Sequence, residues 1–138
     1  MSKSKIIGWV LTALLGAMLI LGSARGKFTE WEGKAEMFGQ LGWSEETMFR
    51  VGIVEVIAAA LFIMPPTAFV GAILLTGYLG GAVAAHVRVG EPFFMPVIIG
   101  IVVWIALGLR DQRVFRMAFQ RSVNPNSPVN QQTESTES

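Results

Sequence analysis

Three side chains that could take part in acid–base or hydrogen-bond chemistry lie in the apolar stretch from Val51 to Val87: Glu55, Tyr78 and His86. Glu55 and His86 are the two groups in this stretch that could carry a charge, and Pro65-Pro66 divides the stretch between Glu55 and Tyr78. An ionisable group in hydrocarbon costs at least about 2.5–3.5 kcal/mol, so it normally faces a partner or a cavity. Glu55 is therefore the strongest functional candidate.

The depths of these groups follow from counting along the two helices expected on either side of the proline pair. At about 1.5 Å per residue, Glu55 lies about 15 Å from the turn, and Tyr78 stands at nearly the same level. A hydrogen bond between the two is geometrically allowed. His86 follows Tyr78 two helical turns later on the same face. The spacing predicts a polar column of Glu55, Tyr78 and His86, which forms the candidate cofactor-binding site.

Each of these residues also has a purely structural interpretation. Tyr78 could donate to a backbone carbonyl, and His86 could be solvated beside Arg88 at a helix end. Glu55 could be a neutral or hydrogen-bonded group that serves only the fold. The sequence leaves these alternatives open.

Two further uncharged apolar runs, Ile6 to Ala24 and Pro92 to Leu109, bring the number of apolar runs to four. A helix needs about 20 residues to cross a hydrocarbon core of about 30 Å, and each run is near that length. The chain is 52% hydrophobic with a mean hydropathy of +0.53. We therefore predict an all-α fold, a four-helix transmembrane bundle formed by residues 1–121. The formal charge of +1 gives no support to nucleic-acid binding, and we exclude that class.

The segment between the first two runs has the pattern of a short amphipathic helix. Its apolar residues recur at spacings of three and four: Phe28, Trp31, Ala35, Phe38 and Leu41. Thr29 and Glu32 have the spacing of a capping box, and Ser44 is the expected N-cap of the second span. Aromatic residues favour the headgroup level, so the sequence predicts an interfacial helix. This helix would act either as a simple lid over the bundle end or as a substrate gate.

Small residues at intervals of four predict where helices pack closely. The two sets are Gly8, Thr12 and Gly16 in span one, and Gly77, Gly81 and Ala85 in span three. Both sets favour a tight bundle over an open pore.

Basic residues flank both ends of the apolar region, which predicts that both termini are cytoplasmic. These residues are Lys3, Lys5, Arg110, Arg113, Arg116 and Arg121. The first run could also be a secretory signal, because Gly22-Ser23-Ala24 offers a small-residue cleavage site. The length of the run favours its retention as a span. Residues 122–138 are rich in Ser, Asn, Gln, Thr and Pro and are expected to form a disordered polar tail.

Several short motifs lie along the chain: Leu41-Gly42-Trp43, Arg50-Val51-Gly52-Ile53-Val54-Glu55, Met64-Pro65-Pro66, and the run from Gly77 to Glu91, GYLGGAVAAHVRVGE. With these motifs the chain resembles DoxX-like membrane proteins over about residues 5 to 112. The resemblance implies a four-span bundle in a bacterial inner membrane. Some members of the family are linked to quinone-reducing or other redox complexes, but the family has no agreed catalytic residues.

The residue inventory limits the redox chemistry that this chain could perform. It has no Cys and a single His, which excludes a dithiol relay, an iron–sulfur cluster and a bis-histidine haem within the chain. We find no metal-ligand spacing and no catalytic motif. A quinone is compatible with the sequence, since Glu55, Tyr78 and His86 could supply its hydrogen-bond partners.

We therefore expect an accessory or quinone-interacting subunit of a membrane oxidoreductase system. Its partners would be the lipid bilayer and a redox-complex protein. One alternative is a non-catalytic membrane scaffold that stabilises a partner. Another is a small-molecule carrier.

Overall fold

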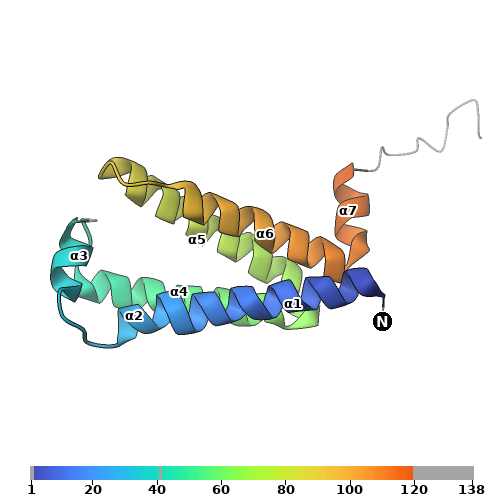
Figure 1. Cartoon of the computed structure of the whole chain (residues 1–138), viewed down its shortest axis with the longest axis horizontal. Helices are drawn as coiled ribbons and strands as arrows, with labels where there is room; N and C mark the ends of the chain where they lie inside the picture. The colour runs from blue at the N-terminus through green and yellow to red at the C-terminus, as the bar shows by residue number, and fades with distance from the viewer. Residues whose placement is uncertain (1, 41, 120–138) are drawn as a thin grey trace, which may run out of the picture.

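The computed structural model describes residues 2–40 and 42–119, and all regular elements in these residues are helical (Figure 1). The α-helices are α1 (Lys3–Ala17), α2 (Arg25–Phe28), α3 (Lys34–Gln40), α4 (Glu45–Ile63), α5 (Ala68–Arg88), α6 (Phe94–Arg110) and α7 (Gln112–Phe119). The π-helix η1 (Met18–Ala24) joins α1 to α2, and the 3₁₀ turn η2 (Pro65–Thr67) joins α4 to α5. The predicted all-α fold class is confirmed, whereas the predicted tail, 122–138, lies outside the described residues.

The first rod of the molecule runs without a break from Lys3 to Phe28 through α1, η1 and α2. Ser2 caps its start, with Oγ accepting from the backbone N–H of Lys5 at 3.4 Å. In the middle, the N–H of Arg25 donates to the carbonyl of Ile20, five residues earlier, as in a π-helix. The helix therefore extends one turn beyond the end of the apolar run at Ala24, and this turn carries Lys27.

Helices α4 and α5 form a hairpin around the proline pair, as predicted. Ser44 caps α4 by accepting from the N–H of Thr47 at 3.2 Å, which confirms the expected cap. Met64 is extended, with φ −73° and ψ 123°, because a residue before proline disfavours the α region. The Thr67 hydroxyl then donates to the Leu61 carbonyl at 2.9 Å and fastens the turn.

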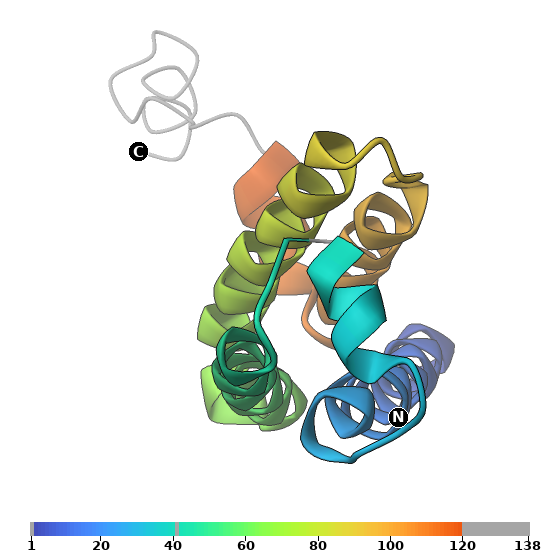
Figure 2. The same cartoon turned by 90° about the vertical axis from the view of Figure 1, so that its left-hand side faces the viewer.

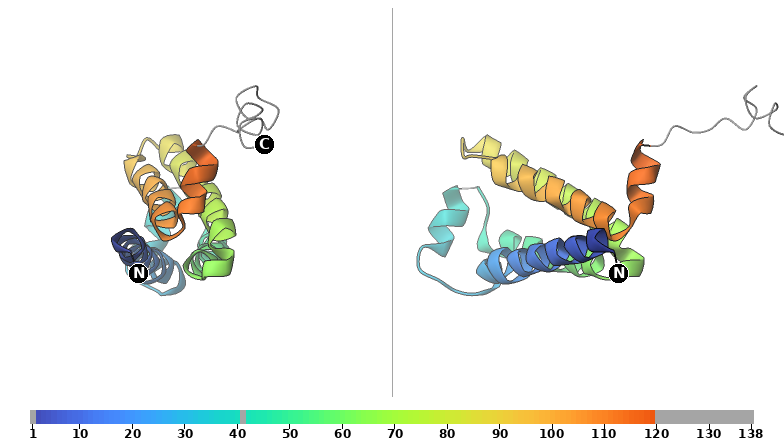
Figure 3. Two further views of the ribbon diagram at one scale, coloured as in Figure 1. Left: turned by 90° about the vertical axis from the view of Figure 1, so that its right-hand side faces the viewer. Right: turned by 45° about the vertical axis from the view of Figure 1, so that its right-hand side comes forward.

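The helices form two pairs, α1 with α4 and α5 with α6, and the pairs meet at one end and diverge toward the other (Figures 1 and 3). Helix α1 packs against α6, α4 packs against α5, and α5 packs against α6. The pairs meet near the N-terminus and diverge toward α3, which stands across the open end (Figure 2). The apolar core includes Phe62, Leu75 and Val103, each at most 1% exposed.

Glycines allow the close approach at the joined end. A Cβ on Gly71 would overlap the backbone of Phe62 in the α4–α5 hairpin. A Cβ on Gly8 would lie 2.9 Å from the Ala106 carbonyl, and one on Gly16 would lie 2.9 Å from the Ile63 side chain. The first predicted packing face, which contains Gly8 and Gly16, is confirmed.

The second predicted packing face is wrong. A Cβ on Gly77 or Gly81 would meet no atom within 4 Å, and both residues line a cavity together with Ala85. Small residues at intervals of four permit a close helix contact but do not require one. Here they widen the space between the diverging pairs.

Arg110 connects several helices at the end of the bundle where the two pairs meet. It is 8% exposed. Its guanidinium donates to the carbonyl of Phe62 at 2.8 Å, to the carbonyl of Ile63 at 3.2 Å and to the Thr12 hydroxyl at 3.3 Å. It also lies 4.1 Å from the centre of the Trp9 ring. Arg110 therefore connects the C-terminal end of α4 to α1 and α6.

Two rods are long and apolar enough to cross a membrane, Lys3–Phe28 and Pro65–Arg88. A third would require α6 and α7 to count as one span, although they are bent by 111°. Helix α4 contains Glu45, Glu46, Arg50 and Glu55 within 19 residues, which lowers its hydropathy. The structure therefore gives two to three candidate spans, and the four-span bundle stays a prediction.

The segment before α4 differs from the amphipathic helix expected there. Thr29 is the C-cap of α2 and the next helix begins five residues later, at Lys34, so Thr29 is not the N-cap of a capping box. Gly33 has φ +80°, a left-handed conformation that glycine adopts readily, and α3 begins only at Lys34. The helix is therefore shorter than predicted, and Leu41 lies outside the described residues.

Candidate functional site

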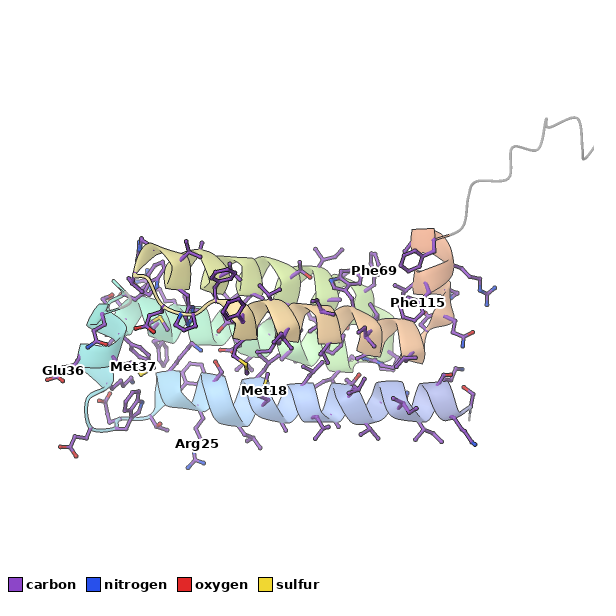
Figure 4. All side chains as sticks on the ribbon, turned by 45° about the horizontal axis from the view of Figure 1, so that its top comes forward. Met18, Arg25, Glu36, Met37, Phe69 and Phe115 are labelled. Carbon is purple, nitrogen blue, oxygen red and sulfur yellow. The ribbon has the colours of Figure 1, made fainter. Side chains whose placement is uncertain are left out.

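A cavity of about 1100 Å³ lies between the diverging helix pairs, beside α3. Its wall is mostly apolar and comes from η1, α3, α4, α5 and the start of α6. The apolar lining includes Met18, Leu19, Phe38, Met48 and Ile99. The charged side chains of Arg25 and Glu36 point away from the bundle (Figure 4). A large apolar cavity with few polar groups is the usual form of a small-molecule site.

Glu55 projects from α4 into the interior and is 0% exposed. Its Oε2 atom accepts from Nζ of Lys27 at 2.7 Å, and the Lys27 side chain is only 8% exposed. Both residues line the cavity. A buried carboxylate thus meets a buried ammonium, and each neutralises the other where water is scarce.

The ammonium of Lys27 is held from several sides. It donates to the Ser23 hydroxyl at 2.7 Å and to the Ser23 carbonyl at 3.4 Å, one turn earlier. The backbone carbonyl of Lys27 accepts from Nζ of Lys34 at 3.2 Å, and this connects α2 to α3. Lys34 also lies 3.6 Å from the carboxylate of Glu30. These contacts fix Lys27 in one position.

The second carboxylate oxygen of Glu55, Oε1, is buried and has no hydrogen-bond partner among the described residues. An ionised carboxylate accepts at both oxygens and donates at neither. Buried polar atoms are nearly always satisfied, so an exception in a cavity wall requires an explanation.

Tyr78 and His86 line the same cavity as Glu55. The structure thus places all three residues of the predicted column around one space. The hydrogen bonds described for Glu55 do not include the expected one to Tyr78. Instead, Nζ of Lys27 donates to Glu55 and lies 5.8 Å from the centre of the Tyr78 ring.

His86 makes a bond within its own helix. Its Nδ1 atom lies 2.7 Å from the Ala82 carbonyl. Because a carbonyl can only accept, Nδ1 carries the proton in this contact, and a neutral ring then has Nε2 as an acceptor. This contact lies within α5 and needs no ligand, so it is compatible with a structural role for His86, although the residue is partly buried and not fully solvated.

Two residues in the cavity wall form a contact between the α3–α4 loop and the end of α5. The guanidinium of Arg88 lies 5.4 Å from the centre of the Trp43 ring, and both residues line the cavity. A Cβ on Gly42, which has φ +79°, would lie 2.5 Å from Arg88. Gly42 therefore provides both the turn and the space for this contact.

Sequence reasoning missed Lys27 and Ser23. Lys27 follows the apolar run, which ends at Ala24, and a basic residue just beyond such a run is expected at the membrane surface. The available signal was the spacing of Ser23 and Lys27, which are neighbours on one face if the helix continues. Among the described residues, no group of three or more His, Cys, Asp or Glu side chains is arranged to hold a metal ion.

Comparison with known proteins gives one match. The family model described as the DoxX-like family matches residues 10–107. No curated protein and no solved structure gives a significant match.

Proposed function

Because the chain belongs to the DoxX-like family, we propose that it is a four-span protein of the bacterial inner membrane with both termini in the cytoplasm. We further propose that its cavity binds a quinone-class molecule and that the protein is an accessory subunit of a membrane oxidoreductase system. The observation that carries this proposal is the apolar cavity with a buried Lys27–Glu55 pair in its wall.

Two features of the helices support membrane insertion. Large apolar side chains of α1 point outward, among them Ile6, Val10 and Leu14, which are 50%, 53% and 63% exposed. Such a surface suits lipid better than water. Helix α4 could cross the membrane although it contains Glu55, because Lys27 neutralises the Glu55 carboxylate within the bundle.

The quinone class fits the wall of the cavity. A quinone combines an apolar ring and tail with two polar oxygen atoms, so it needs a large apolar space with few hydrogen-bonding groups. The cavity has these properties, with Tyr78 and Glu55 on facing helices α5 and α4. Trp31 and Trp43 at its edge provide a spectroscopic reporter.

Organic-solvent extraction of the purified full chain, followed by a chromatographic assay for quinone, tests the proposal. We expect quinone in the extract, and we expect Glu55→Ala and Tyr78→Phe each to reduce it. Their effects should be non-additive, because neighbouring groups share one ligand. Glu46→Ala on the exposed start of α4 is the matched control and should retain the quinone. Absence of quinone from the native protein, both after purification and after direct addition, would refute the proposal.

A scaffold without a ligand is the second candidate, and the Lys27–Glu55 pair itself favours it. The pair connects α2 to α4 and would serve the fold alone. In that case Glu55→Gln should lower the thermal stability, because it leaves the buried Lys27 ammonium without its anion, and no variant should alter quinone content because none would be present.

A further inference from the structure

The ion pair in the wall of the cavity offers a free acceptor to a ligand, whereas the donor of the pair is already engaged. The ammonium of Lys27 has three protons, and the structure gives it three acceptors: Oε2 of Glu55, the Ser23 hydroxyl and the Ser23 carbonyl. These acceptors already engage the Lys27 ammonium, and the Tyr78 hydroxyl is a further neighbour of it. Oε1 of Glu55, in contrast, has lone pairs and no donor among the described residues.

From this asymmetry we infer that the cavity selects a ligand that donates a neutral hydroxyl group to Oε1 of Glu55. This inference rests on the proposed function and specifies it. Within the quinone class, the selected form is the hydroquinone, which has two hydroxyl groups, rather than the quinone, which has only carbonyl oxygens. Glu55 is then the specificity-determining residue, and Lys27 and Ser23 are the residues that position it.

A hydroxyl is favoured over a charged donor by the electrostatics of the wall. Lys27 and Glu55 neutralise each other, and Arg88 adds a positive charge at the end of the cavity. A cationic ligand would bring a further positive charge into apolar surroundings, where an uncompensated charge is expensive. A neutral hydroxyl satisfies Oε1 without that penalty.

A series of three ligands with the same short tail tests the inference on the native full chain. The ligands are a para-hydroquinone, its dimethyl ether and the corresponding quinone. They are titrated without oxygen while the tryptophan fluorescence, to which Trp31 and Trp43 in the cavity wall contribute, is recorded. A hydrogen bond to a charged group should make the hydroquinone bind about tenfold or more tightly than the dimethyl ether. The quinone should also bind more weakly than the hydroquinone.

The variant Glu55→Gln should reverse the order. Lys27 would keep the amide oxygen as its acceptor, and the NH₂ group of the amide would then face the cavity as a donor. This variant should prefer the quinone over the hydroquinone. The control is Glu46→Gln, which removes one carboxylate from an exposed pair on the same helix and should keep the native order.

The outcomes separate the two proposals. If the hydroquinone and its dimethyl ether bind equally well, the inference fails and the proposed function stands. An unchanged order in a folded Glu55→Gln variant also overturns the inference. If this variant does not fold, the ligand series on the native chain decides alone. If none of the three ligands binds, both the proposed function and the inference fail.

Discussion

Nζ of Lys27 lies 2.7 Å from Oε2 of Glu55, which joins the end of the first rod to the middle of α4 across 28 positions of sequence. Both side chains are almost completely buried. The stability of such a pair depends on both members, since either one alone would be a buried and uncompensated charge.

The first prediction concerns this pair. Lys27→Met should lower the free energy of unfolding by about 3–5 kcal/mol, because it leaves the Glu55 carboxylate without its cation. Lys27→Met combined with Glu55→Gln should cost much less than the sum of the single changes. Reversible unfolding in mixed micelles measures these values. In the exposed Glu46–Arg50 pair, Arg50→Met should cost about 1 kcal/mol or less. Strictly additive effects of the Lys27 and Glu55 changes would contradict the buried ion pair.

The second prediction compares two glycines of α5. Gly71→Ala places a Cβ on the backbone of Phe62 and should destabilise the protein by about 1–3 kcal/mol. Gly77→Ala meets no atom within 4 Å and should stabilise the helix by about 0.5–1 kcal/mol. Thermal melting of the two variants in the same detergent gives the comparison. Equal losses at both positions would show that the helix pairs do not diverge at Gly77.

The third prediction concerns the joined end of the bundle. Arg110→Met removes the donor to the carbonyls of Phe62 and Ile63. We expect this change to lower the free energy of unfolding by at least about 1–3 kcal/mol. Arg113→Met is the control, because the Arg113 side chain is 82% exposed and pairs with Asp111 at the surface. The control variant should lower the free energy of unfolding by about 1 kcal/mol or less. Similar melting temperatures for both variants would argue against the buried role of Arg110.

The fourth prediction concerns topology, and it uses the absence of native Cys. Lys3→Cys and Glu36→Cys place single thiols at exposed positions near opposite ends of the bundle. In intact cells an impermeant thiol reagent should label Glu36→Cys, whereas Lys3→Cys should react only after permeabilisation. The reverse pattern would invert the proposed orientation.

Local chemistry made several parts of the fold predictable from the sequence. Pro65-Pro66 breaks a helix whatever surrounds it, and Ser44 caps α4 through a bond to a residue only three positions away. Glu55 could be chosen as a candidate because a lone acid in an apolar run is costly in any fold.

The remaining parts depend on contacts that no local pattern encodes. Whether Gly77 meets a helix or a cavity is decided by the divergence of the two helix pairs. The start of α3 is set by the left-handed conformation of Gly33, which competes with a good amphipathic pattern. Lys27 could not be assigned as the partner of Glu55, because their contact requires a particular rotation of the first rod.

That rotation is set by the seven-residue π-helix from Met18 to Ala24. Its wider turns advance each residue by less than the roughly 100° of an α-helix, so every side chain beyond Ala24 is turned relative to those of α1. Deleting one residue between Met18 and Gly22 would rotate Ser23 and Lys27 together and aim the ammonium away from α4. The length of this segment therefore sets the orientation of the site, and we expect the site to tolerate substitutions on the apolar surface of the segment more readily than a change in its length.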